Sequence, residues 1–371
     1  MTTPTPHGPN ESVGGPFRQG LDQPDDGQRR RQSGEGAPSR GRGRRRRREG
    51  GEQVTVPPAD FVSYYGRPIL KPPVWKRDIP AYLFTGGLAA GSALTAAGGQ
   101  LTGRAGLRQV GRWTALGGVA VSTYFLVHDL GRPERFHHML RVAKLTSPMS
   151  VGTWILATFG PAAGVAAVAE LAPLLPRRGV LGLARRVAPP VGNVANLLAA
   201  ATAPALATYT GVLLADTAVP SWHDAYPQLP FVFAGSALAA ASGVGLIAAP
   251  AAETAPLRRL AVAAAAIELI GGHRLERMGL TSEPYREGRG GRLVRAGRAL
   301  LAAGVAGALF GRRSRAVSAI SGAALLASSV ATRFGVFEAG MASARDPKYT
   351  VVPQRERRDK EGGRSPAEQL E

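Results

Sequence analysis

Residues 128–150 read HDLGRPERFHHMLRVAKLTSPMS, and this polar stretch lies between two long apolar runs. One apolar run ends at Val127 and the next begins near Met149. About twenty consecutive apolar residues cross the hydrocarbon core of a bilayer as a helix. The pattern therefore predicts two membrane-spanning helices joined by a loop rich in arginine and histidine. At the membrane surface, such a loop can meet a ligand head group or a docked partner.

The chain has 371 residues, a formal net charge of +20 and a mean hydropathy of −0.05, but these values average two unlike parts. Residues 1–55 are rich in Gly, Pro and Arg and lack the apolar side chains that bury a core, so we predict a disordered basic tail. Residues 78–340 consist largely of Ala, Leu, Val and Gly in runs. This composition predicts an all-α fold, a polytopic helical bundle in a membrane.

Eight membrane-spanning helices are predicted, with seven as the alternative. The predicted spans are residues 79–101, 110–127, 151–175, 190–217, 230–249, 257–272, 299–311 and 316–332. The run at 299–311 is marginal, because it reaches the length of a span only if Arg295 and Arg298 snorkel and Leu293 is included. Short final spans are therefore expected.

Two further segments flank these spans. Residues 56–77 contain several prolines, which oppose a helix, together with Tyr and Trp residues that suit the headgroup layer. We expect them to run along the membrane surface. Residues 341–371 form a charged C-terminal tail. The positive-inside rule favours a multi-pass protein of the cell membrane with both termini in the cytoplasm, although the opposite loops also carry arginines.

The arginine block at residues 40–48 is open to two interpretations. It can determine topology as a solvated basic tail, or it can bind RNA or anionic lipid. A single-strand binder interleaves aromatic side chains for base stacking, and this block has none. We therefore favour the solvated tail that determines topology, and predict no specific nucleic-acid partner. Membrane lipid is an expected partner of the chain as a whole.

The sequence contains no cysteine, which excludes disulfides, thiolate metal sites and cysteine-ligated iron–sulfur clusters in this chain. A membrane b-type haem requires paired histidines at similar depth on spanning helices. The histidines are His7, His128, His137, His138, His223 and His273. None lies in the middle of a predicted span, so no haem is predicted. Electron transfer would then require a bound organic carrier and a separate metal-containing subunit.

Acidic residues in or beside a span are the first functional candidates, because a charge within the bilayer is costly unless it is paired or hydrated. Glu170, Asp216 and Asp129 lie near span ends, and surface placement is expected for Glu170 and Asp216. Glu268 lies deeper, within the sequence AAIELIGG. It is a candidate for a proton-carrying or quinone-facing carboxylate, and a helix–helix hydrogen bond is the alternative.

The basic side chains of the 128–150 loop have several possible roles. Arg132, Arg135, Arg141 and Lys144 can hydrogen-bond a quinone oxygen or meet an acidic partner surface. Ordinary charge facing the lipid headgroups is the alternative. Composition alone does not decide between these roles.

Several separate motifs of the chain resemble those of one known family and occur in the same order along the sequence. They are Tyr82-Leu83-Phe84-Thr85-Gly86-Gly87-Leu88, Asp129-Leu130-Gly131-Arg132-Pro133-Glu134-Arg135-Phe136, Ser147-Pro148-Met149-Ser150 followed by Gly152 and Trp154, Thr208-Tyr209-Thr210-Gly211-Val212-Leu213-Leu214, Arg333-Phe334, Phe337-Glu338-Ala339-Gly340 and Asp346-Pro347-Lys348-Tyr349. Together they cover about residues 60–355. In these motifs the chain resembles the NrfD family, the membrane subunits of polysulfide-reductase-like respiratory complexes.

The resemblance implies an eight-helix bundle that binds quinone, with menaquinone the expected form, near one membrane face. Such a subunit exchanges electrons with a ferredoxin-like iron–sulfur subunit that serves a molybdopterin catalytic subunit. It is itself either quinone-reacting or a non-catalytic member of the oxidoreductase complex. Two rival functions remain open. One is a membrane transporter, for which inverted repeats and broken helices would be expected. The other is a purely structural membrane anchor.

Candidate site residues follow from the matched loop. His128 or Asp129 would accept a proton as quinol is oxidised, and Arg132 or Arg135 would orient the quinone head group. Tyr82 and Trp154 lie in the neighbouring motifs and are the further candidates for quinone binding. Glu268 completes the proton-handling candidates on the basis of its depth in the bundle.

Overall fold

The computed structural model describes residues 68–311 and 314–362. The predicted tail at residues 1–55 and the first part of the predicted lead-in, up to residue 67, lie outside these ranges. The described part of the chain contains helices and no β-strand, which confirms the all-α prediction. Eight helices of this part are at least 20 residues long.

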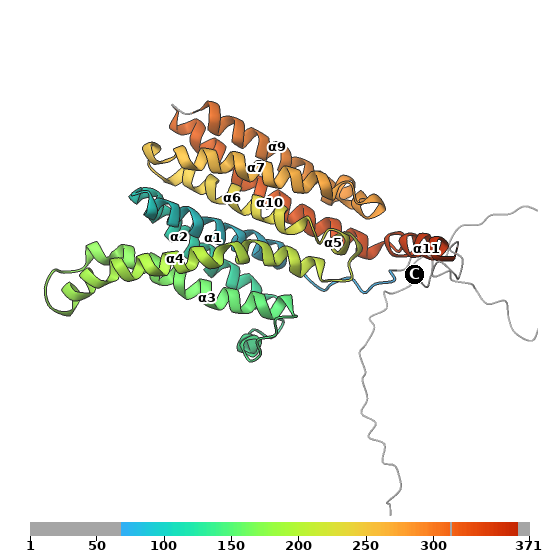
Figure 1. Ribbon diagram of the computed structural model, residues 1–371, viewed down its shortest axis with the longest axis horizontal. Helices are drawn as coiled ribbons and strands as arrows, with labels where there is room; N and C mark the ends of the chain where they lie inside the picture. Colours follow the sequence, from blue (N-terminus) through green and yellow to red (C-terminus); the bar gives the residue numbers. More distant parts are fainter. Residues whose placement is uncertain (1–67, 312–313, 363–371) are drawn as a thin grey trace, which may run out of the picture. The chain divides into compact units, whose positions relative to one another are not determined.

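The elements follow the predicted order along the chain (Figure 1). The long helices are α1 (Asp78–Leu101), α2 (Ala105–His128), α3 (Pro148–Val168), α4 (Gly179–Ala215), α6 (Leu229–Ala248), α7 (Ala255–Leu275), α9 (Gly288–Phe310) and α10 (Arg315–Arg345). The shorter elements are η1 (Pro133–Leu140), η2 (Ala169–Leu174), α5 (Pro220–Asp224), η3 (Ala251–Glu253), η4 (Gly279–Ser282), α8 (Glu283–Arg286) and α11 (Lys348–Gly362).

The long helices pack as two groups of four. In the first group α1 contacts α2 and α4, and α3 contacts α2 and α4. In the second group α6 contacts α7 and α10, and α9 contacts α7 and α10. Helices α1, α4 and α6 join the two groups, as Figure 1 shows. Consecutive long helices pack side by side and alternate in direction. One end of the bundle therefore holds the starts of α1, α3, α6 and α9 and the ends of α2, α4, α7 and α10, and we call it the loop end.

Among residues 68–311 and 314–362, five segments are long and apolar enough to cross a membrane: α3 with η2, α4, α6, α9 and α10. The remaining long helices are α1, α2 and α7, and the last two carry charged residues within their length, including Arg112 in α2 and Glu268 in α7. The described residues thus form a polytopic helical bundle. The number of spans stays a prediction.

The expectation of short final spans is wrong. Helix α9 begins at Gly288 and has 23 residues, and α10 continues to Arg345 over 31 residues. Arg298 does not need to snorkel, because its Nη1 lies 2.6 Å from Oε1 of Glu276 and its Nη2 donates to the Gly272 carbonyl at 3.3 Å. Pairing within the protein lets the helix extend past its charged residues.

The flanking segments are partly as predicted. Residues 68–77 contain no helix, as their prolines predict. The Trp75 ring stacks on Trp222 with 5.9 Å between ring centroids, so this part of the lead-in packs on α5. The predicted charged tail is mostly helical where the structure describes it, because residues 341–345 end α10 and residues 348–362 form α11.

Small residues allow the closest helix contacts, as is typical of membrane bundles. A Cβ atom on Gly91 of α1 would lie 2.4 Å from the carbonyl oxygen of Ala237 in α6. The backbones of these two helices therefore approach each other at a point where only glycine fits. Gly98, on the same helix, has no atom within 4 Å of its Cβ position.

Replacing Gly91 with Ala is expected to lower the free energy of unfolding by about 1–3 kcal/mol, because the obstructing atom belongs to a backbone and cannot rotate away. Gly98→Ala is the matched control on the same helix, and its better helix propensity should raise stability by up to about 1 kcal/mol. Unfolding midpoints in detergent measure both variants. Equal stability of the two would show that the contact between α1 and α6 is not tight.

Candidate functional site

A cavity of about 270 Å³ opens at the loop end of the first helix group. Its lining comes from residues 74–75, α1, the end of α2 and the connection after it, η1, α3 and α4. Most of the lining is apolar. The polar side chains at the cavity are Tyr82, Asp129, Thr153 and Tyr209. We call this space the loop-end cavity.

Asp129 is the acidic residue of the loop-end cavity. It caps the C-terminus of α2, where its backbone N–H donates to the Phe125 carbonyl at 3.1 Å. Burial raises the pKa of its carboxyl, and Asp78 acts in the same direction. The Lys76 backbone N–H and the charges of Lys76 and His128 oppose this rise in pKa. A carboxyl with a raised pKa beside an apolar cavity is suited to taking up and releasing a proton.

Two tyrosines from different helices contribute to the polar lining. Tyr82 of α1 and Tyr209 of α4 are 3% and 8% exposed, respectively. The position of the Tyr209 ring depends on Gly152 of α3, where a Cβ atom would lie 2.1 Å from the Cε2 atom of Tyr209. Gly152 therefore leaves the space that the Tyr209 ring occupies at the cavity wall.

Gly152→Ala is expected to destabilise the chain by about 1–3 kcal/mol, because the new methyl group displaces the Tyr209 ring. The cost should disappear in a Tyr209→Ala background, where the ring is absent, and a double-mutant cycle on unfolding midpoints measures this coupling. Gly164→Ala in the same helix is the control, since no atom lies within 4 Å of its Cβ position. Purely additive costs at Gly152 and Tyr209 would contradict the prediction.

The other candidates from the loop lie outside the cavity. The side chain of His128 is 58% exposed, its Nδ1 lies 3.2 Å from Oδ2 of Asp78, and its ring stacks on Tyr124. Arg132 and Arg135 are exposed at the start of η1, after a turn that Gly131 makes with a φ of 68°. The structure thus places His128 next to Asp129 at the surface and both arginines on the outside of the loop.

Trp154 and Glu268 lie away from the loop-end cavity. Trp154 is 42% exposed, donates from Nε1 to the Val142 carbonyl at 3.4 Å, and lines a different hollow that includes Lys144. Glu268 is 4% exposed, and its Oε1 accepts a hydrogen bond from the Thr332 hydroxyl at 2.7 Å. The helix–helix hydrogen bond that was the alternative for Glu268 is therefore present between α7 and α10.

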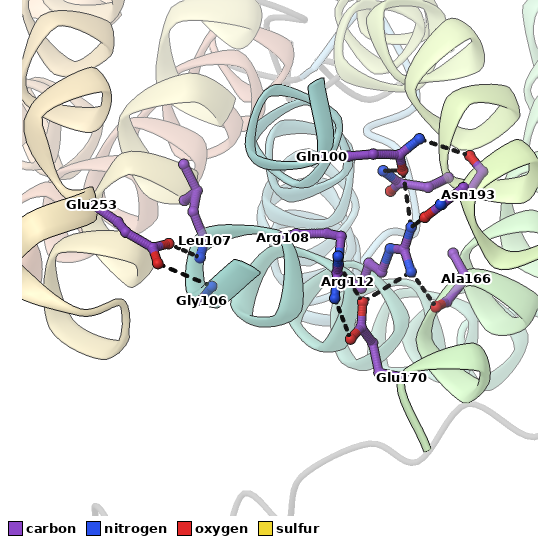
Figure 2. Close-up of polar contacts among 10 residues, drawn as sticks. Gln100, Gly106, Leu107, Arg108, Arg112, Ala166, Glu170, Asn193 and Glu253 are labelled. Carbon is purple, nitrogen blue, oxygen red and sulfur yellow. Dashed lines mark hydrogen bonds and ion pairs between the residues drawn. The ribbon is translucent and has the colours of Figure 1, made fainter. Parts of the chain in front are cut away.

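A buried polar network lies at the opposite end of the first helix group (Figure 2). The Arg112 guanidinium donates to Glu170 at 2.8 Å, Gln100 at 2.9 Å and Asn193 at 2.7 Å. Arg108 donates to both oxygens of the Glu170 carboxylate, at 2.7 and 3.0 Å. The network therefore links α1, α2, η2 and α4.

The expectation that Glu170 lies at the surface is wrong. Its side chain is 8% exposed and is held by two arginines. The reason is that α2 begins at Ala105, earlier than predicted, so its first turns place Arg108 and Arg112 against η2. Asp216 is exposed at the C-cap of α4, as predicted.

The two most deeply buried arginines of the described residues are absent from the sequence-based candidates. Arg112 is 3% exposed and Arg333 is 0% exposed. Both carried a signal in the sequence, because an arginine within or directly after an apolar run is costly unless it has partners. The sequence-based candidates within the spans were chosen among acidic residues, so these arginines were not included.

The comparisons with known proteins agree with this architecture. The family model described as polysulphide reductase, NrfD, matches residues 69–265. The matched range runs from before α1 into α7 and includes all lining residues of the loop-end cavity. No curated protein matches the chain. Since the family model covers more than half of the sequence, the chain belongs to the NrfD family of polytopic membrane proteins.

Proposed function

We propose that the chain is the membrane subunit of a respiratory oxidoreductase complex and binds quinol or quinone in the loop-end cavity. The observation that carries the proposal is the meeting of four separate sequence motifs at one cavity. Each of these four motif segments contributes one polar residue to the lining of this space: Tyr82, Asp129, Thr153 and Tyr209. Family membership supports a quinone-interacting role.

The residues of the cavity fit a quinone head group. Small-molecule sites are largely apolar spaces of roughly 300–1,000 Å³ with a few polar groups. The loop-end cavity, at about 270 Å³, is close to the lower limit and has a similar balance of lining residues. It suits a ring system whose long apolar tail extends outside. Menaquinone is the form that the family resemblance favours.

A bound quinol supplies electrons and protons together, and the side chains of the chain handle the protons. Asp129 takes up a proton at its carboxylate, for which its position and raised pKa are suited. The buried hydroxyls of Tyr82 and Tyr209 orient the ligand by hydrogen bonding. The proton then leaves toward His128 and Asp78, which are next to Asp129 at the surface.

The exposed basic side chains of the loop are proposed to meet a partner instead of the quinone. Arg132, Arg135, Arg141 and Lys144 are exposed in the described structure. A positive surface attracts and orients an acidic protein. The expected partner is a ferredoxin-like iron–sulfur subunit, which would carry electrons between the quinone site and a molybdopterin catalytic subunit. The positive-inside rule then favours a cell-membrane protein with cytoplasmic termini and this loop on the cytoplasmic side.

Purification of the full chain from native membranes in mild detergent tests the proposal. Mass spectrometry of the co-purified proteins and extracted lipids is expected to find an iron–sulfur protein, a molybdopterin enzyme and a quinone. A chain that purifies with neither quinone nor an iron–sulfur protein would overturn the proposal and favour transport. An intact complex that oxidises quinol equally well when the cavity residues are substituted would instead identify a structural anchor.

A further inference from the structure

The second helix group contains buried charged residues that the quinone site does not use. Glu268 of α7 is 4% exposed and Arg333 of α10 is fully buried. The Arg333 Nη2 donates to the Phe233 carbonyl at 2.7 Å, and its guanidinium carbon lies 3.9 Å from the centroid of the Phe233 ring. Within the described residues, Glu268 and Arg333 do not form an ion pair with each other.

Both buried groups have polar atoms without partners. The Oε2 atom of Glu268 and the Nε and Nη1 atoms of Arg333 accept or donate no hydrogen bond in the described structure. A buried carboxylate oxygen without a protein donor needs either a proton or a water molecule. The hydrogen bond from Thr332 occupies only the other oxygen of Glu268.

A small cavity adjoins Glu268 and is large enough for one water molecule. It measures about 20 Å³ and is lined by Glu268, Tyr285, Arg298 and Thr332, among others. A space of about 10–15 Å³ accommodates the centre of one water molecule when several polar groups surround it. This cavity meets both conditions.

One ion pair joins a lining residue of the small cavity to a residue that lines a surface cleft. Arg298, which lines the cavity, contacts Glu276 with 2.6 Å between Nη1 and Oε1. Glu276 also lines an open cleft of about 660 Å³ at the loop end. The order from inside to outside is therefore a buried carboxylate, a space for one water, a guanidinium, a second carboxylate and an open cleft.

Among the described residues, the helices around Glu268 present few polar side chains to it, and Arg298 is the one that leads to the surface cleft. Helix α9 contributes Arg298 and helix α10 contributes Thr332 and Arg333. Tyr285 of α8 lines the small cavity and donates from its hydroxyl to the Ser221 carbonyl at 2.9 Å. Helix α6 approaches Glu268 through Gly235 and has no ionisable residue in its sequence.

We propose that Glu268 is a proton-exchange site that communicates with the loop-end cleft through the small cavity, with the Arg298–Glu276 ion pair as its gate. When Arg298 moves aside, a proton passes from hydronium in the cleft through the cavity water to Oε2 of Glu268. The carboxylate becomes a neutral acid. On release, the same proton returns to water by the same route. The site is separate from the loop-end cavity and does not depend on quinone binding there.

Infrared difference spectroscopy of the purified full chain tests this proposal without measuring turnover. A protonated carboxylic acid has a distinct carbonyl stretch, which shifts when the buffer changes from H₂O to D₂O. The wild-type chain is expected to show such a band over part of the pH range, and Glu268→Gln should remove it. Absence of any band assignable to Glu268, or a band that does not shift in D₂O, would overturn the proposal.

The gate is tested by the rate of hydrogen–deuterium exchange at the Glu268 carboxyl, measured from the shift of its infrared band. Glu276→Gln removes the negative charge that holds Arg298, so exchange should become about tenfold faster, as expected when a charge-assisted hydrogen bond is weakened. Glu287→Gln is the matched control, because Glu287 lines the same cleft and is exposed, and it should leave the rate unchanged. Both variants keep Glu268, so the comparison of their exchange rates remains a test of the proposal even if Glu268→Gln fails to fold. Equal rates in both variants and the wild type would refute the gate.

Discussion

Asp129→Asn is expected to lower quinol oxidation by about 10²- to 10⁴-fold per assembled complex, which is the usual contribution of a general acid or base. Asparagine keeps the size of the side chain and the backbone hydrogen bond that caps α2, but it cannot take up a proton. Detergent-solubilised complex with saturating quinol and an artificial electron acceptor provides the assay. The amount of assembled complex should stay unchanged.

The pH dependence gives a second signature of Asp129. The carboxylate form accepts the proton, and burial raises the pKa of this group. Below that raised pKa the carboxyl is already protonated and cannot act, so the wild-type rate should rise as the pH rises through it. In Asp129→Asn this rising limb should be absent. A variant that keeps the limb would assign the titration to another group.

Asp216→Asn is the matched control for this experiment. Asp216 caps the C-terminus of α4 at the same end of the bundle, as Asp129 caps α2, but it is exposed and does not line the loop-end cavity. Its substitution should leave both the rate and the pH profile unchanged. Equal losses in the two variants would indicate a general effect of removing acidic residues from this surface.

Glu170→Gln is expected to have the largest effect on stability, a loss of about 3–5 kcal/mol, because it leaves buried positive charge without its anion. The side chain of Arg112 is 2% exposed and that of Arg108 is 32% exposed, so water reaches Arg112 poorly. Glutamine keeps an acceptor oxygen but removes the charge shared by both arginines. Unfolding midpoints in detergent micelles measure the loss.

Glu338→Gln is the matched control for Glu170→Gln. Glu338 pairs with Arg289 at 3.7 Å, and the side chain of Arg289 is 58% exposed. A solvent-exposed pair of this kind contributes about 0–1 kcal/mol, so the control should change little. Similar costs for the two substitutions would show that the Arg108–Arg112–Glu170 network does not hold the first helix group together.

Much of the fold was predictable because span length and composition act locally. The order of the eight long helices and the absence of a helix over residues 68–77 follow from apolar runs and from proline. The predicted family is confirmed over residues 69–265. Helix ends at charged residues were predicted less well, because Arg298 contacts Glu276 from another helix, and such pairing is not visible in a local pattern.

The candidate site was predicted in part for a similar reason. Tyr82 and Asp129 both line the loop-end cavity. Trp154 was expected beside them, but Thr153 faces the cavity and Trp154 faces a different hollow. Adjacent residues on a helix point about 100° apart, so a motif identifies the helix and not the face that meets a ligand.

By itself, the sequence determined the class of protein: a basic polar segment followed by an apolar helical bundle, without cysteine and with its family motifs in order. These properties depend on composition and on spacing along one chain. Only the tertiary structure decided which polar residues meet. It joined Asp129 to Tyr82 and Tyr209 at one cavity, and it buried Glu170 between two arginines. The physical reason is that the low dielectric of the bundle makes each buried charge depend on partners from other helices, whose positions are set by packing.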